Sequence, residues 1–78
     1  MQNIGIKDND IIDFRKKIGV ELCKIREERG LTIEGLAEKI GKKKSTVASI
    51  EDGRWDFSID MLALFAMHLG FDIIVEKH

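Results

Sequence analysis

Apolar residues recur at steps of three and four along most of this 78-residue chain, which is the period of an amphipathic helix. The first run covers residues 10–29 and contains Ile11, Phe14, Ile18, Leu22 and Ile25. Shorter runs follow over residues 33–40, 44–52 and 59–69. The pattern predicts a mainly α, compact domain of four to five helices, and the unpatterned residues 1–9 are expected to be a flexible N-terminus.

The residues that border these runs support the helix boundaries. Three of the runs follow a residue that caps helix N-termini, namely Asp10, Thr32 and Ser58. Each run is followed by a glycine, at Gly30, Gly41, Gly53 and Gly70. Gly19 lies inside the first run, where a glycine costs about 1 kcal/mol relative to alanine. The first helix is therefore expected to be locally weaker than its apolar pattern alone would make it.

The second and third runs together have the outline of a helix-turn-helix. They are two short helices joined at Gly41, with the small residue Ala37 where crossing helices must approach closely. The third helix is expected to turn Val47 and Ile50 inward. Its outward positions are then Lys44, Ser45, Ala48 and Ser49. This motif places one helix in the major groove of DNA.

After Gly70 the helical period stops, and the β-branched residues 71–76 predict a short strand. A single strand leaves its backbone groups unpaired, so the same strand of a second copy, antiparallel about a two-fold axis, is the expected partner. The alternatives are an irregular tail, or pairing with residues 3–6. The residues expected in the dimer strand are Phe71, Ile73, Ile74 and Val75. The predicted organisation is thus a helix-turn-helix domain over residues 10–70 and a dimerisation strand and tail over residues 71–78.

Charge is unevenly distributed along the chain, although the net charge is only −1. Residues 42–54 have an excess of +2, from Lys42, Lys43, Lys44 and Arg54 against Glu51 and Asp52. Residues 55–78 have an excess of −3. The positive segment coincides with the expected DNA-facing helix, which favours nucleic-acid binding there. A solvated lysine turn is the alternative.

Other classes of protein find little support in the sequence. No apolar run approaches the ~20 residues of a membrane span, and no signal-peptide pattern starts the chain. The single Cys23 fits a reducing cytoplasm and is expected to be a buried packing residue. His68 and His78 are isolated, and no phosphate-binding loop or nucleophile–base pair is evident. We therefore expect no enzyme activity, no cofactor and no metal site.

From Leu22 to Leu69 the chain resembles the Cro/CI or XRE family of phage-repressor-type helix-turn-helix domains. The matching residues are Leu22, Arg26, Gly30-Leu31-Thr32, Leu36-Ala37, Ile40-Gly41, Ser45-Thr46-Val47, Ile50-Glu51-Asp52-Gly53 and the helix from Leu62 to Gly70. The resemblance implies a lambda-repressor-like fold and a dimeric repressor that binds double-stranded DNA sequence-specifically.

The tail after Gly70 is similar to the C-terminal strand of antitoxins that pair with kinase-type toxins. The alternative function is therefore an antitoxin that binds a toxin protein and represses its own operon. The exposed residues expected to contact such a toxin are Trp55, Asp60 and His68.

The resemblance also implies roles for individual residues. Base contacts fall on Lys44, Ser45 and Ser49. Phosphate contacts fall on Lys42, Lys43, Thr46 and Arg54. A structural ion pair is implied between Arg26 and Glu51. Lysine donates to guanine O6 and N7, whereas serine hydroxyls discriminate poorly between bases.

The chain departs from the family pattern at several positions. Ile33 stands where the family usually has a glutamine that contacts phosphate, and Gly35 replaces a helix former. Lys43 takes the place of the serine or threonine that caps the recognition helix, so this helix is expected to begin without a side-chain cap. Residues 55–57 lack the usual proline before the fourth helix.

Overall fold

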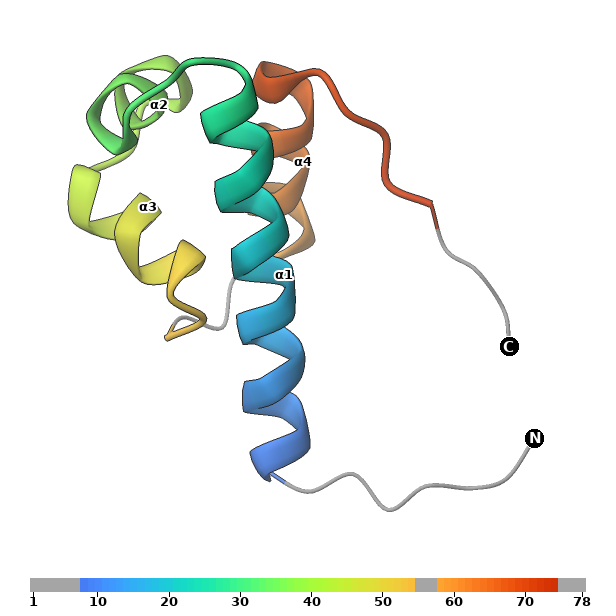
Figure 1. The fold of residues 1–78 in the computed structure, drawn as a ribbon. Helices are drawn as coiled ribbons and strands as arrows, with labels where there is room; N and C mark the ends of the chain where they lie inside the picture. The colour runs from blue at the N-terminus through green and yellow to red at the C-terminus, as the bar shows by residue number, and fades with distance from the viewer. Residues whose placement is uncertain (1–7, 55–57, 75–78) are drawn as a thin grey trace.

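The structure is a computed structural model that describes residues 8–54 and 58–74. Four helices form, α1 (Asp8–Glu28), α2 (Ile33–Ile40), α3 (Lys44–Glu51) and α4 (Ile59–Leu69) (Figure 1). The prediction of a mainly α chain with helices in these four segments is confirmed. The predicted start of the first helix is wrong by two residues, because α1 begins at Asp8 and Asp10 lies within its first turn.

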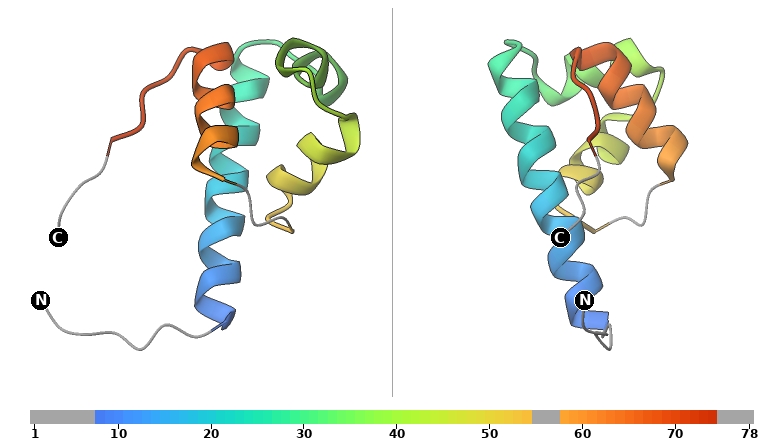
Figure 2. Two further views of the ribbon diagram at one scale, coloured as in Figure 1. Left: turned by 180° about the vertical axis from the view of Figure 1, so that it is seen from behind. Right: turned by 90° about the vertical axis from the view of Figure 1, so that its right-hand side faces the viewer.

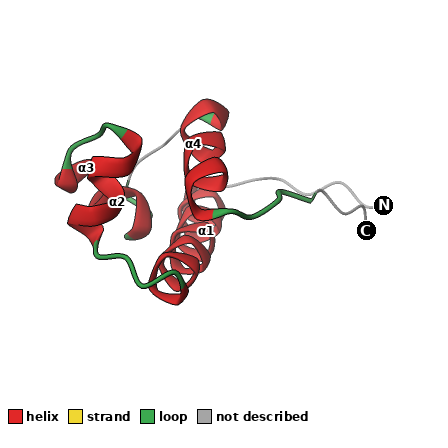
Figure 3. Ribbon diagram, turned by 90° about the horizontal axis from the view of Figure 1, so that it is seen from above, coloured by secondary structure: helices red, strands yellow, loops and turns green. Residues whose placement is uncertain are grey.

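The helices pack around one small core to which all four contribute. α2 and α3 lie on one side of α1, and α4 lies beside the C-terminal half of α1 (Figures 1 and 3). The buried apolar residues are Leu22, Leu36, Ala37, Ile40, Val47, Ile50, Phe65 and Leu69. Among the residues that the structure describes, no helix is both long enough and apolar enough to cross a bilayer.

The apolar stripe of α1 is buried over only part of its length. Ile18 and Ile25 pack against the core, but Ile11 is 47% exposed and Phe14 is 65% exposed. The N-terminal half of α1 extends past the other three helices, as both views in Figure 2 show. The helical period correctly predicted a helix here, but no other described segment covers the first part of its apolar face.

Local capping chemistry explains where α2, α3 and α4 begin. The hydroxyl of Thr32 accepts a hydrogen bond from the Gly35 backbone N–H at 2.9 Å, and Ser58 accepts one from Met61 at 3.1 Å. Both predicted caps are confirmed. Lys43 occupies the same position before α3 and makes no side-chain cap bond. α3 is therefore the helix that depends most on tertiary contacts.

Gly19 has a packing role that its local cost does not reveal. A Cβ atom built on Gly19 would overlap the carbonyl oxygen of Glu51 and lie 2.8 Å from that of Ile50. The missing side chain lets α1 touch the end of α3 directly. Gly19 therefore lowers the helix propensity of α1 but allows α3 to pack closely against it.

The C-terminal segment has no regular secondary structure over residues 71–74 and projects away from the helices (Figures 1 and 3). The part of the predicted strand that the structure describes, residues 71–74, is therefore not a strand in a single copy of the chain. Val75 and Glu76 lie outside the described residues, as do residues 3–6 and Trp55. Pairing with a second copy stays a prediction.

Candidate nucleic-acid interface

The buried and exposed sides of α3 separate cleanly. Val47 and Ile50 have no exposed surface, and they fix the rotation of the helix about its axis. Lys44 and Ser45 are exposed in the first turn, and Ser49 is half-buried. Ser45 and Ser49 are four residues apart, so they lie on the same edge of the helix. Two of the three residues expected to contact bases thus share one edge of α3, and Lys44 lies next to Ser45 in the first turn.

A buried ion pair fixes the far end of α3 to α1. Arg26 Nε donates to Glu51 Oε2 at 2.7 Å, and Arg26 Nη2 donates to Glu51 Oε1 at 3.0 Å. The two side chains are only 8% and 6% exposed. The hydrogen bond to Glu51 raises the pKa of Arg26, so the guanidinium keeps its positive charge. The paired geometry holds α3 at a defined angle to α1.

The same guanidinium also organises the chain between α1 and α2. Arg26 Nη1 donates to the carbonyl oxygen of Leu31 at 2.6 Å. Arg26 Nη2 lies 3.4 Å from the Cys23 sulfur. Burial, followed by the nearby Glu51 charge, raises the pKa of the Cys23 thiol above its ordinary value. Cys23 is therefore a protonated thiol at neutral pH, the form that reacts poorly.

Positive charge gathers at the turn before α3. Lys42, Lys43 and Lys44 are all exposed, and none is within ion-pair distance of a carboxylate in the described part of the chain. Thr46 is half-buried beside them. A shallow groove runs from this turn to the start of α4, lined by Gly41, Lys42, Lys43, Ser45, Thr46 and Met61. A phosphate backbone at the N-terminal end of α3 would meet uncompensated cations.

Arg54 differs from these lysines, because its charge is already engaged. Its Nη2 atom lies 2.8 Å from Asp52 Oδ2, in a pair whose side chains are 67% and 60% exposed. The structure therefore brings together Lys42, Lys43, Lys44 and Ser45 at one end of α3, and leaves Arg54 at the other end beside a carboxylate.

Two departures from the family pattern have local structural consequences. Ile33 is half-buried and packs against the core, so the first turn of α2 offers no side-chain donor at that position. At Gly35 only the backbone N–H takes part in the cap, because glycine has no side chain to return a bond to Thr32. α2 is thus fixed by packing and by a one-sided cap.

Arg29 is a structural residue that the sequence did not reveal. Its Nε atom donates to the carbonyl oxygen of Leu69 at 2.7 Å, and its Nη2 atom donates to that of Gly70 at 3.2 Å. These bonds join the end of α1 to the end of α4, across 40 residues of sequence. A basic residue at the end of a helix is common, and only the tertiary fold identifies its partner.

Comparisons with known proteins agree with this geometry. A family model described as "Helix-turn-helix domain" matches residues 17–76. The clp gene regulator ClgR from C. glutamicum is 29% identical, with a TM-score of 0.73 over 76% of each chain. The restriction-modification controller protein C.AhdI from Aeromonas hydrophila is 28% identical, with a TM-score of 0.74 over 77% of this chain and 91% of that one.

A third similar structure is an HTH_3 family transcriptional regulator from Vibrio cholerae, 27% identical with a TM-score of 0.73. The match covers 80% of this chain but only 35% of that longer one. A search of the curated proteins finds no match. The family model covers most of the chain, and the matched structures share its four-helix arrangement. The chain therefore belongs to the helix-turn-helix domain family, and this fold supports a role in DNA-binding transcription regulation.

Proposed function

We propose that the chain is a cytoplasmic, dimeric repressor that binds double-stranded DNA sequence-specifically through α3. One observation carries the proposal. The inner face of α3 is fully buried and its end is held by the Arg26–Glu51 pair, while Lys44 and Ser45 stand exposed on its first turn. A helix fixed at one end and on one face presents the other face to a rigid groove at little entropic cost.

The chemistry of the exposed edge suits base contacts at a few positions. Lys44 donates to guanine O6 or N7, and Ser45 and Ser49 add hydrogen bonds of low selectivity. The phosphate contacts come from Lys42, Lys43 and Thr46, which fix the register of the protein on the duplex. Two copies would place two α3 helices in half-sites about 34 Å apart.

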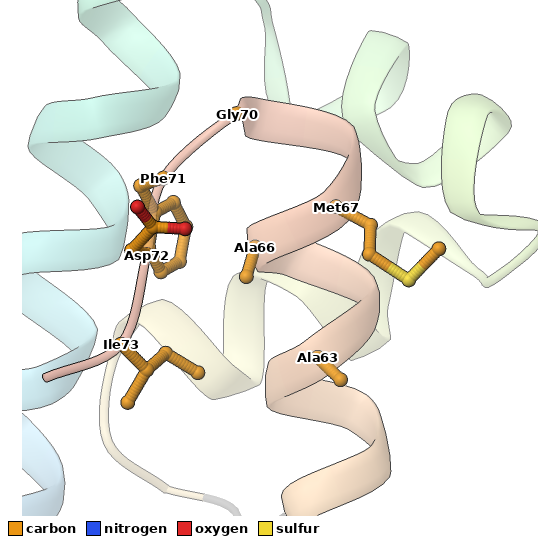
Figure 4. A pocket seen from close by; sticks show the side chains of 7 residues that line it. All are labelled: Ala63, Ala66, Met67, Gly70, Phe71, Asp72 and Ile73. Atoms are coloured by element: carbon orange, nitrogen blue, oxygen red, sulfur yellow. The ribbon is translucent and has the colours of Figure 1, made fainter.

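A second copy is favoured by an uncovered apolar surface on α4 and the C-terminal segment. Ile59 is 81% exposed and Met67 is 77% exposed, although α4 also buries Phe65 on its other side. Apolar residues all round a helix are typical of one that is covered on both sides. A groove of about 520 Å³ separates this face of α4 from the segment that follows it (Figure 4). It is lined by Ala63, Ala66, Met67, Gly70, Phe71, Asp72 and Ile73.

The C-terminal segment lies on the side of the molecule away from α2 and α3 (Figure 3). A second copy bound there leaves both recognition helices free. It also brings the two C-terminal segments together, so that residues 71–76 of each copy pair as antiparallel strands. Pairing would bury Ile73 and Ile74, which are 50% and 78% exposed in one copy.

The proposal is tested by selecting bound sequences from random DNA with the purified chain. The expected result is a two-fold-symmetric motif whose half-sites are centred about one helical turn apart. A pool that yields no enriched motif would contradict sequence-specific binding. A single unsymmetric motif would contradict binding as a dimer.

An antitoxin is the second candidate, favoured by the same apolar surface and by the exposed Asp60 and His68 beside it on α4. A toxin would then cover this surface while the dimer represses its own operon. Co-purification of the chain with the product of a neighbouring gene supports this function. Absence of any bound protein in a pull-down from native extract counts against it.

A further inference from the structure

We propose that Lys16 of α1 binds a DNA phosphate at the C-terminal end of α3. This contact lies outside the helix-turn-helix and adds a positioning residue to the DNA-binding function proposed above, on which it rests. It is argued from the place where the chain leaves α3, where Gly53 meets α1.

Gly53 lies directly against the backbone of Lys16. Gly53 is buried and has a φ of +74°, and a Cβ atom built on it would come within 2.7 Å of the Cα atom of Lys16 and 2.8 Å of its nitrogen. One turn further along α1, Gly19 touches the last carbonyl groups of α3. These two close approaches place Lys16 beside the C-terminal end of α3, with its side chain exposed.

The C-terminal end of α3 would repel a phosphate without an added cation. A helix C-terminus carries a partial charge of roughly −0.5. The nearby Arg54 and Asp52 neutralise each other at 2.8 Å, and Glu51 is neutralised by Arg26. The ammonium group of Lys16 forms no ion pair with any residue that the structure describes. Lys16 therefore adds an exposed cation from α1 to this end of α3.

The spacing of the cations suits the width of the DNA groove. α3 has 8 residues and so rises about 12 Å, which is about the width of the major groove. Lys42, Lys43 and Lys44 stand at its N-terminal end and Lys16 at its C-terminal end. When the first turn of α3 contacts base edges, the other end lies toward a phosphate backbone. Lys42 and Lys43 then contact one of the two backbones that border the groove, and Lys16 contacts the other.

The test compares the full-length chain with Lys16→Gln, using the duplex selected above and an unrelated duplex, at salt concentrations from about 50 to 200 mM. Loss of one phosphate contact lowers the slope of log K against log salt by about 0.9. If the two proteins bind equally at 1 M salt, this slope change makes Lys16→Gln bind roughly eightfold more weakly than the parent chain at 0.1 M salt. The loss applies to both duplexes because phosphates carry no sequence information.

Lys17→Gln is the matched control, because Lys17 is equally exposed on α1 but is turned by about 100° from Lys16. It is expected to keep the slope of the parent chain. Lys16→Arg retains the charge and is expected to restore the slope, and equal thermal unfolding midpoints show that the variants are folded.

An unchanged slope for Lys16→Gln would overturn the contact, as would an equal loss for Lys17→Gln. In either case Lys44→Ala would still weaken binding to the selected duplex, and the proposed DNA-binding function would stand. A parent chain that binds neither duplex would overturn the proposed function itself, and the Lys16 contact with it.

Discussion

At the scale of single residues, Arg26 and Glu51 decide how α3 is presented. The Arg26 guanidinium makes four contacts at once, two of them to one carboxylate, in a site that excludes most water. The three lysines before α3 have no such bonds within the described residues and remain available to a ligand. Buried charge thus builds the scaffold in this chain, and the proposed DNA contacts rest on exposed charge.

Glu51→Ala is expected to lower the free energy of unfolding by about 3–5 kcal/mol, because it leaves the buried Arg26 charge unpaired. For a domain of this size such a loss is comparable to the whole stability. Urea or thermal unfolding followed by circular dichroism measures it.

Glu21→Ala provides the control, because Glu21 pairs with Lys24 at 3.5 Å while both side chains are more than 60% exposed. That exposed pair is worth at most about 1 kcal/mol. Similar unfolding curves for the two variants would show that the Arg26–Glu51 pair does not stabilise the fold.

At the scale of elements, the sequence predicted the helix positions and their caps, because these depend on residues that are close together in the chain. Thr32 and Ser58 cap α2 and α4 as their local chemistry indicates, and the four helices lie where the apolar period places them. Contacts between distant segments were not predictable from the period. The bond from Arg29 to Leu69 and the contact of Gly19 with the end of α3 both join such segments. The exposure of Phe14 likewise depends on how far the other helices extend along α1, rather than on the pattern of α1 itself.

Gly19→Ala tests whether the contact of α1 with α3 outweighs helix propensity, because the two have opposite effects on the free energy of unfolding. Propensity alone would stabilise α1 by about 1 kcal/mol. The new Cβ atom would instead collide with the backbone of Glu51 and Ile50, and neither carbonyl can move without displacing α3. We expect a net destabilisation of about 1–3 kcal/mol. Urea denaturation compared with Lys17→Ala, at an exposed α1 position, measures it, and a stabilised Gly19→Ala would contradict the packing role.

At the scale of the whole molecule, two different surfaces lie on opposite sides of α1 and α4. The side of α2 and α3 carries exposed lysines. The C-terminal segment leaves from the other side, beside the groove that Phe71 and Ile73 form with Ala63 and Ala66 of α4 (Figures 3 and 4). The sequence predicted the first side from charge. It predicted a dimer from residues 71–76 but gave no sign of the outer face of α4, because a helix whose residues are apolar all round has no amphipathic direction to interpret.

Met67→Asp tests the apolar surface as a dimer interface. A carboxylate on this 77%-exposed position costs little in one copy but would be buried without a partner between two. The variant is expected to sediment as a monomer and to bind a two-fold-symmetric site roughly 10²-fold or more weakly, because the half-sites no longer bind together.

Val20→Asp is the control for Met67→Asp. Val20 is 50% exposed on α1, beside Lys16, Lys17 and Glu21, and this variant is expected to remain a dimer. If the parent chain sediments as a monomer and Met67→Asp binds with unchanged affinity, the apolar surface has another role.

The central claim is that α3 contacts bases through Lys44. It is tested most directly by combining a substitution in the protein with base-pair substitutions in the DNA site. The affinities of the parent chain and of Lys44→Ala are measured for the selected site and for versions in which each G·C pair is replaced in turn. We expect Lys44→Ala to cost about 1–3 kcal/mol on the selected site and to lose discrimination at one base pair per half-site while keeping it at the others. Equal affinity of the two proteins for the selected site, with the same preference at every base pair, would contradict the assignment of α3 as the recognition helix.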